Sequence, residues 1–213
     1  MKTIELFSGT GSFSKVAGLK GHSTFCVDKF NGLGKLDLQV DLEKWLPIGY
    51  CCDFVWASPP CTAFSVASIG RNWDKDTRLP KSEKALLGLR LLDNTIKIIT
   101  IIKPKYWVIE NPRGMMRKVI DKVFEKYGIT DYERKTVTYC QYGDTRMKPT
   151  DLWIGGFKWN TKPMCKNGDP CHVSAPRGSR TGTQGLKNNK ERSVIPPALF
   201  EELFKELEVK NDI

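Results

Sequence analysis

The chain has 213 residues and a formal net charge of +10, with 40% hydrophobic and 27% charged residues. This length and balance are typical of one globular domain, or one domain with a small lobe, and no apolar run reaches the roughly 20 residues of a membrane span. The seven cysteines are odd in number and irregularly spaced, which is typical of reduced thiols in a cytoplasm. The positive charge favours a polyanionic partner such as nucleic acid over a membrane.

The first two thirds of the chain alternate strand-like and helix-like segments. We expect Ser82 to cap a long helix and Gly128 to end the helix that follows it. Such alternation predicts an α/β fold, a mainly parallel sheet with helices on both faces. We expect strands over residues 2–7, 24–28, 36–41, 53–58 and 105–110, helices over 13–19, 82–101 and 113–127, and a terminal antiparallel pair formed by 134–140 and 151–155.

Residues 157–192 have a different character, because Gly, Pro, Asn, Lys and Arg dominate and the hydrophobic periodicity is lost. We interpret them as a small, loop-rich basic lobe without a core of its own. Pro196 and Pro197 then start a final amphipathic helix that extends to about residue 207. The predicted domains are therefore a catalytic domain, 1–156 with 193–213, and a basic lobe, 157–192.

A glycine-rich turn joins the first predicted strand to the first helix. Its glycines allow a ligand to approach the backbone, and the helix N-terminus offers free N–H groups. Asp28 and Asp41 are expected at the ends of the second and third strands, where one carboxylate could bind ribose hydroxyls and the other an adenine amino group. The candidate nucleotide-type site comprises Phe7, Ser8, Gly9, Thr10, Gly11, Ser12, Asp28 and Asp41.

Two further strand ends carry reactive side chains. Cys61 follows Pro59 and Pro60 directly after the fourth strand, and Glu110 ends the next strand. Because parallel strands end at the same edge of a sheet, the thiol and the carboxyl are expected to lie close together. A cysteine and a carboxyl beside an adenosyl site are a plausible set for attack on a pyrimidine ring.

These motifs together resemble the DNA (cytosine-5) methyltransferase family, in family order and over almost the whole chain. Phe7 to Ser12 resembles the donor-binding glycine motif, Pro60–Cys61 the nucleophile motif, and Glu110–Asn111–Pro112 the Glu-Asn motif, in which many members carry valine instead of proline. The family usually has Gln-x-Arg-x-Arg after Tyr142–Gly143, whereas this chain keeps only basic character there, in Arg146 and Lys148. Arg192–Ser193 resembles the final motif, which folds back onto the donor. The chain resembles a short phage or bacterial member with a minimal target-recognition region.

The resemblance implies a Rossmann-like class I methyltransferase fold, with S-adenosyl-L-methionine or a close analogue as donor and Pro60 and Ser193 beside it. The Cys61 thiolate would add to C6 of a cytosine flipped out of the stack, Glu110 would bond N3 and the exocyclic amine, and C5 would then be alkylated. Asn111, Arg146 and Lys148 would complete the catalytic set. We expect double-stranded DNA as the partner, a monomer, and a cytoplasmic location in a bacterial or phage-infected cell.

The basic lobe is expected to bind DNA mainly through phosphates, and residues 71–78 are expected to form a mobile element that closes over the flipped base. The predicted nucleic-acid-binding residues are Arg71, Arg78, Lys162, Arg177, Arg180 and Lys187.

Other interpretations stay open at this point. Cys165, Cys171 and His172 could be three zinc ligands, but their spacing fits no known finger and the sequence shows no fourth ligand, so no metal site is predicted. Cytosine-N4 methylation, cytosine-5 methylation of RNA, and nucleic-acid binding without catalysis remain alternatives. The target sequence and the group transferred, methyl or carboxymethyl, are not specified by these motifs.

Overall fold

The computed structural model describes residues 1–31, 34–174, 186 and 188–211. Within these residues a seven-stranded sheet has the order β3-β2-β1-β4-β5-β7-β6. The first five of these strands are parallel, and β7 runs antiparallel to both β5 and β6. The predicted α/β fold with a terminal antiparallel pair is thus confirmed. The strands are β1 (Lys2–Leu6), β2 (Ser23–Asp28), β3 (Leu38–Gln39), β4 (Phe54–Ala57), β5 (Tyr106–Pro112), β6 (Glu133–Thr138) and β7 (Pro149–Gly155).

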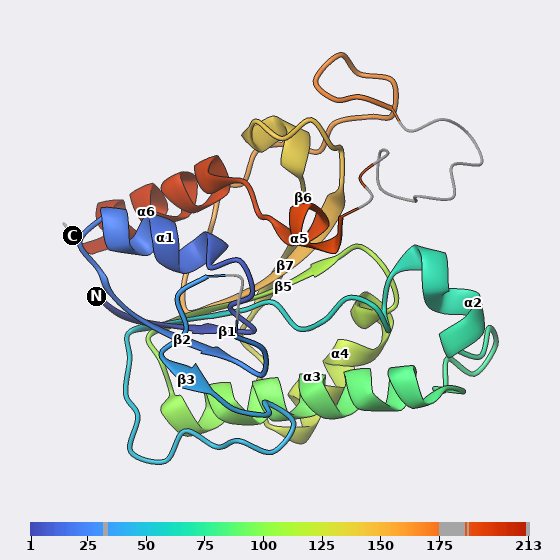
Figure 1. Ribbon diagram of the computed structural model, residues 1–213, viewed down its shortest axis with the longest axis horizontal. Helices are drawn as coiled ribbons and strands as arrows, with labels where there is room; N and C mark the ends of the chain where they lie inside the picture. The colour runs from blue at the N-terminus through green and yellow to red at the C-terminus, as the bar shows by residue number, and fades with distance from the viewer. Residues whose placement is uncertain (32–33, 175–185, 187, 212–213) are drawn as a thin grey trace.

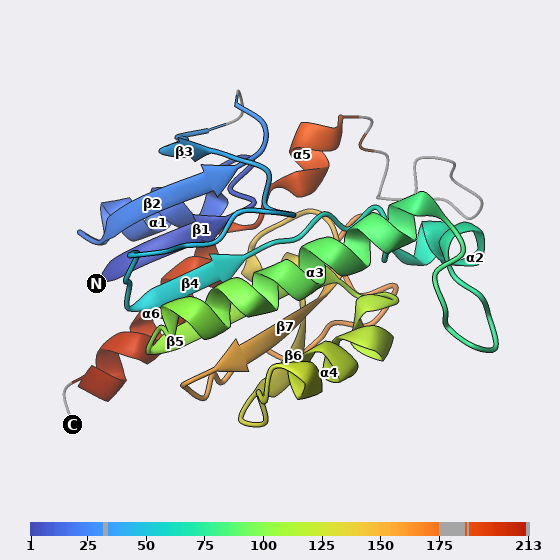
Figure 2. The same ribbon diagram turned by 90° about the horizontal axis from the view of Figure 1, so that it is seen from below.

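Helices cover both faces of the sheet. Figure 1 shows α1 and α6 on one face and α3 and α4 on the other, and Figure 2 shows α3 running along the sheet beside α4. The α-helices are α1 (Ser12–Leu19), α2 (Ile69–Asn72), α3 (Glu83–Ile102), α4 (Met116–Lys126), α5 (Asn189–Ser193) and α6 (Pro197–Asn211), and η1 (Val66–Ser68) and η2 (Tyr139–Tyr142) are short 3-10 helices. Among the described helices, none has the length and apolar character needed to cross a membrane.

The two faces of the sheet carry separate hydrophobic clusters, because successive side chains of a strand point to opposite sides. In β4, Phe54 and Trp56 belong to the cluster that includes α1 and α6, whereas Val55 and Ala57 belong to the cluster that includes α3 and α4. All four residues are fully buried. This fixes β4 at the centre of the molecule, so the segment that follows it starts from a rigid support.

The boundaries of the helices and strands lie close to the predicted ones, with a few differences. Ser82 does cap α3, since its hydroxyl accepts a hydrogen bond from the backbone N–H of Ala85 at 3.2 Å. The fifth strand does not stop at Glu110, because antiparallel pairing with β7 carries it through Asn111 to Pro112. The third strand is only two residues long, and the short helix α5 lies where no periodicity predicted one.

Candidate active site

The segment after β4 places Cys61 at the carboxyl edge of the sheet. The backbone N–H groups of Phe64 and Ser65 both donate to the Cys61 carbonyl, at 3.0 and 2.9 Å, and so form a tight turn directly after the cysteine. From the neighbouring strand, the Asn111 side-chain amide donates to the carbonyl of Pro59 at 2.8 Å. Asn111 is fully buried and therefore positions the nucleophile segment.

The far end of this segment is held by a close approach of two backbones. Ser65 and Gly114 form an isolated β-bridge, and the Met115 N–H donates to the Phe64 carbonyl at 2.7 Å. A Cβ atom at Gly114 would lie 2.2 Å from the Phe64 carbonyl oxygen, so this position requires glycine. The Trp73 indole also donates to the Ala63 carbonyl, at 2.7 Å. The nucleophile turn is thus fixed from three sides.

Glu110 is buried at the end of β5 and surrounded by hydroxyl groups. The Tyr139 hydroxyl donates to its Oε1 atom at 2.9 Å, and the Ser58 hydroxyl, which itself accepts from the Trp56 indole at 2.9 Å, also bonds this carboxyl. Burial raises the pKa of Glu110, and the positive charge of Lys148 only partly opposes this shift. The carboxyl is therefore suited to carry a proton, as a group that protonates a base must.

Lys148 and Glu110 both contact the Tyr139 side chain, so the ammonium and the carboxyl belong to one cluster. The Lys148 ammonium donates to the Arg192 carbonyl at 2.9 Å and lies 4.7 Å from the centre of the Tyr139 ring. Burial lowers the pKa of Lys148, while the charge of Glu110 raises it. A partly desolvated cation is thus held next to the carboxyl.

The Cys61 thiol is influenced by the same groups. Burial raises its pKa, and the negative charge of Glu110 raises it further, whereas Lys148 and Arg192 lower it. The thiol form therefore predominates in the free protein at neutral pH, and loss of the Glu110 charge would favour the thiolate. Cys61 and Glu110 thus lie within electrostatic reach of each other and of Lys148, and their catalytic roles stay a prediction.

Arg146 has a different place from the one expected for a catalytic residue. Its guanidinium is buried, binds the Asp144 carboxylate, and donates to the backbone carbonyls of Glu191, Arg192 and Val194. These contacts tie α5 and the start of the final segment to the loop before β7. These contacts engage the guanidinium in holding residues 191–194, and a direct catalytic role of Arg146 stays a prediction.

The predicted donor turn has the shape that a close ligand needs. Phe7, Gly9 and Gly11 all have positive φ angles, of 58°, 47° and 65°. The Gly11 N–H donates to the Ser8 carbonyl at 2.6 Å, and the hydroxyls of Thr10 and Ser12 lie 2.7 Å apart. The turn is therefore tight and internally bonded.

The two predicted donor acids differ in their surroundings. Asp28 accepts hydrogen bonds from the backbone N–H groups of Gly9, at 2.8 Å, and Phe30, at 3.1 Å. Asp41 lies two residues beyond β3, not at its end, and pairs with the Lys29 ammonium at 2.8 Å, which lowers the pKa of this carboxyl. Asp28 shapes the glycine turn, whereas Asp41 is engaged in a solvent-exposed ion pair.

The final segment folds back onto the donor turn. The Ile195 N–H donates to the Ser12 hydroxyl at 3.2 Å, which joins positions 183 residues apart. Ser193 is exposed and bonds the Lys190 carbonyl of its own helix at 2.8 Å. The return of this segment agrees with the expectation for the final motif.

The predicted nucleic-acid-binding residues are only partly described. Arg71 and Arg78 are exposed on either side of Trp73, which is anchored under the nucleophile turn. Lys162 is exposed and donates to the Gln141 carbonyl at 3.0 Å. Arg177, Arg180 and Lys187 lie outside the described residues.

Three residues of the site were not predicted from the sequence. Glu5 is buried in β1, and its carboxyl accepts hydrogen bonds from the backbone N–H groups of Phe13 and Ser14, at 3.3 and 3.0 Å, near the start of α1. Burial raises the pKa of Glu5 to about 7. A charged residue inside an apolar strand was the signal for it. Tyr139 and Arg192 come from distant segments, and their contacts with Glu110 and Lys148 depend on the fold.

Comparisons with a protein family and with a viral relative agree with the resemblance seen in the motifs. Residues 37–136 match the family described as C-5 cytosine-specific DNA methylase. The chain is 34% identical over 228 residues to the "Probable DNA (cytosine-5)-methyltransferase" of Frog virus 3 (isolate Goorha), covering 96% of this chain and 99% of the relative.

Solved structures of low sequence identity share the fold. The Entamoeba histolytica methyltransferase EhMeth is 18% identical, with a TM-score of 0.54 over 76% of this chain and 55% of that one. The chain spans about half the length of the solved structures it matches. With the glycine turn, the Pro-Cys turn and the buried Glu-Asn pair in this arrangement, the chain belongs to the C-5 cytosine-specific DNA methylase family.

Proposed function

We propose that this protein transfers a methyl group from S-adenosylmethionine to C5 of cytosine in DNA, with Cys61 as the nucleophile. The observation that carries this proposal is a set of contacts: Asn111, next to Glu110, holds the Pro59 carbonyl of the Cys61 segment at 2.8 Å, and Tyr139 contacts both Glu110 and Lys148. A thiol beside a protonatable carboxyl is suited to attack on a ring carbon with protonation of the ring nitrogen.

The donor is proposed to bind at the glycine turn. When bound, S-adenosylmethionine supplies an electrophilic methyl group. The residues fit such a ligand, because Gly9 and Gly11 keep the backbone open to close approach. The Asp28 carboxylate, already bonded to two backbone N–H groups, retains lone pairs for ribose hydroxyls.

The chemical step needs proton movements at both catalytic residues. The Cys61 thiol loses its proton to solvent, and its sulfur forms a bond to C6 of the cytosine while Glu110 donates its proton to N3. This converts C5 into an enamine-like carbon, which would accept the methyl group as the methyl–sulfur bond of the donor breaks and S-adenosylhomocysteine is left. A base then removes the C5 proton, the sulfur–C6 bond breaks, and Glu110 regains its proton from N3.

Cytosine in a duplex must leave the base stack before Cys61 can reach C6, at a cost of a few kcal/mol. We propose double-stranded DNA as the substrate and a monomer as the active form. Exposed Arg71, Arg78 and Lys162 would meet phosphates, together with Arg177, Arg180 and Lys187 of the basic lobe. The free state of all seven cysteines supports a reducing, cytoplasmic setting.

The test combines a trapping substrate with a thiol variant. DNA that contains 5-fluorocytosine should form a denaturation-resistant complex with the wild type when the donor is added, because fluorine at C5 blocks elimination. Cys61→Ser should form no such complex and transfer no methyl group, while its calorimetric affinity for the donor stays close to that of the wild type.

Cys51→Ser is the matched control, since Cys51 is an exposed cysteine before β4, and it should behave as the wild type. Mass spectrometry of the nucleosides identifies the product. A trapped complex with Cys61→Ser, or a product that is only N4-methylcytosine or appears only in RNA, would contradict the proposal.

A further inference from the structure

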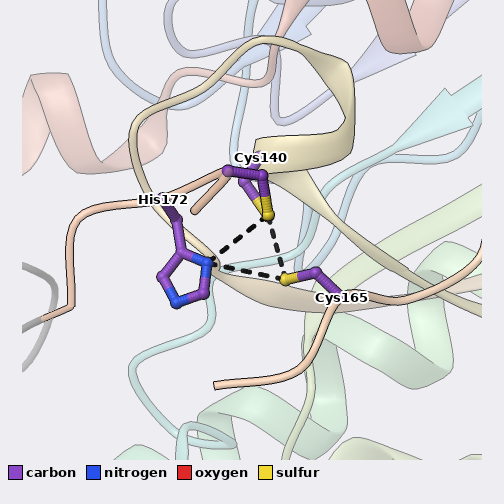
Figure 3. Close-up of side chains that lie close together, drawn as sticks. Cys140, Cys165 and His172 are labelled. Carbon is purple, nitrogen blue, oxygen red and sulfur yellow. Dashed lines mark hydrogen bonds between the residues drawn. The ribbon is translucent and has the colours of Figure 1, made fainter. Parts of the chain in front are cut away.

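Four side chains of metal-binding type converge outside the active site. Cys140 lies in η2, directly after β6, whereas Cys165, Cys171 and His172 come from the segment that follows β7. One ligand atom of each of these residues lies within 4.8 Å of those of the other three. Figure 3 shows the sulfur atoms of Cys140 and Cys165 and the imidazole of His172 pointing toward one another.

The separations fit the corners of one tetrahedron. The Cys140 sulfur lies 3.1 Å from that of Cys165 and 3.5 Å from that of Cys171. The His172 Nδ1 atom lies 3.7 and 3.6 Å from the sulfurs of Cys165 and Cys171. Two ligands of a tetrahedral zinc ion, bound at about 2.0–2.3 Å, are separated by about 3.6–3.8 Å. The closest pair, at 3.1 Å, would have to move apart by roughly half an ångström, and the two remaining pairs lie within 4.8 Å.

The backbone around the cluster is organised to hold these ligands. The Cys165 N–H donates to the Thr138 hydroxyl at 3.0 Å, which fixes the cysteine against the end of β6. The Lys166 N–H donates to the Asp169 carboxylate at 2.6 Å, and the Asp169 N–H donates to the Lys166 carbonyl at 3.1 Å. This closed turn, with Gly168 at a φ of 96°, brings Cys171 back beside Cys165.

We propose that Cys140, Cys165, Cys171 and His172 bind one Zn²⁺ ion that has a structural role. Three thiolates and one imidazole are a preferred zinc donor set, and four protein ligands leave no position open for a substrate. The Gln141 side-chain amide points its nitrogen at the Cys171 sulfur at 3.6 Å, as groups around metal-bound thiolates do. The fourth ligand comes from a different segment, 25 residues before Cys165, which is why the sequence alone did not reveal it.

The ion would join the first part of the basic lobe to the catalytic domain. Val173, next to His172, donates its N–H to the Thr145 carbonyl at 2.9 Å, and Thr145 precedes Arg146. The zinc site therefore lies at the base of the loop that carries Arg146 and Lys148. Binding of zinc would therefore fix residues 165–173 against this loop.

The experiment measures metal in the full-length protein, purified without chelator from cells grown with added zinc. We expect about one zinc ion per chain, released by a mercurial reagent that blocks thiols. Cys165→Ser and His172→Ala should each contain roughly fivefold less zinc or lower, because loss of one ligand opens the site. Cys51→Ser, which removes an exposed cysteine elsewhere, should keep the wild-type content.

A second readout does not depend on the folding of the variants. Wild-type protein stripped of metal and reconstituted with Co²⁺ should show the absorption of a tetrahedral thiolate site, including sulfur-to-cobalt charge transfer. Wild-type protein that contains no zinc and shows no such spectrum would overturn the proposal. So would a disulfide between Cys140 and Cys165 in peptides from the native protein, or a zinc content that falls equally in the Cys51→Ser control.

Discussion

The proposed active site has two sides, a catalytic wall and a donor wall, which are built in different ways. In the catalytic wall, formed by Cys61, Glu110 and Lys148, burial is the main cause of every pKa shift. In the donor wall, formed by the glycine turn with Asp28 and Asp41, both carboxylates are partly exposed and bond backbone N–H groups.

The difference agrees with the chemistry proposed for each wall. A proton is moved and a thiolate is formed at the catalytic wall, and charges interact strongly there because water is excluded. The donor is already charged and reactive, so its wall needs a fixed shape more than it needs perturbed acids. Substitutions should therefore have larger effects in the catalytic wall than in the donor wall.

The largest expected effect comes from replacing Glu110, the proposed proton donor to N3. Glu110→Gln should lower the methylation rate by about 10²–10⁴-fold, the usual contribution of a positioned acid. The same change should lower the pKa of Cys61, because the Glu110 carboxylate raises it. The Cys61 thiol should therefore be alkylated by iodoacetamide at lower pH in the variant, as followed by peptide mass spectrometry.

Lys148→Met should have the opposite effect and raise the pKa of Cys61, because the Lys148 charge lowers it. Alkylation of Cys61 should then need a higher pH than in the wild type. Glu125→Gln, an exposed carboxyl on α4, is the control and should leave the alkylation profile unchanged. Shifts in the same direction for Glu110→Gln and Lys148→Met would show that the catalytic wall does not couple these three groups.

A second prediction tests whether the catalytic wall depends on the close backbone contact between Gly114 and Phe64. Gly114→Ala would place a Cβ atom 2.2 Å from the Phe64 carbonyl and so push the nucleophile turn away from β5. We expect the free energy of unfolding to fall by about 1–3 kcal/mol, as for other overpacked sites, and kcat to fall with unchanged donor affinity. Urea unfolding and calorimetry measure the two quantities.

Gly70→Ala is the matched control, because a Cβ atom there would have no neighbour within 4 Å. It should leave stability unchanged or slightly higher, since alanine favours helices. Equal destabilisation by the two substitutions would mean that the close approach at Gly114 does not support the nucleophile turn.

The catalytic wall was largely predictable from sequence because its positions are defined by strand ends. Cys61 comes shortly after β4 and Glu110 lies near the end of β5, and parallel strands bring such positions together. The extension of β5 to Pro112 was not predictable, because it requires the partner strand β7. Tyr139 and Arg192 were not predictable for the same reason, since they reach the site through tertiary contacts.

In the donor wall, the backbone turn could be predicted from the sequence, but the roles of its two acids could not. Its glycines were predicted from the turn pattern, and the positive φ angles of Gly9 and Gly11 agree with it. Asp28 and Asp41 could not be distinguished from the sequence, because both were predicted at strand ends. The two acids differ because Asp41 pairs with Lys29, whereas Asp28 accepts hydrogen bonds from two backbone N–H groups of the glycine turn and the following loop.

The smallest effects are expected in the donor wall, where these two acids should differ. Asp28→Ala removes the acceptor of the Gly9 N–H and should weaken S-adenosylmethionine binding by about 1–3 kcal/mol, the cost of leaving such partners unsatisfied. Asp41→Ala breaks an exposed ion pair and should change the binding free energy by less than about 1 kcal/mol. Calorimetric titration of both variants, with thermal unfolding to confirm that each is folded, measures the difference. If Asp41→Ala weakened binding more than Asp28→Ala, the carboxylate of Asp41 would have to leave Lys29 and contact the donor directly. The donor wall would then act through its charged side chains, and its contrast with the catalytic wall would disappear.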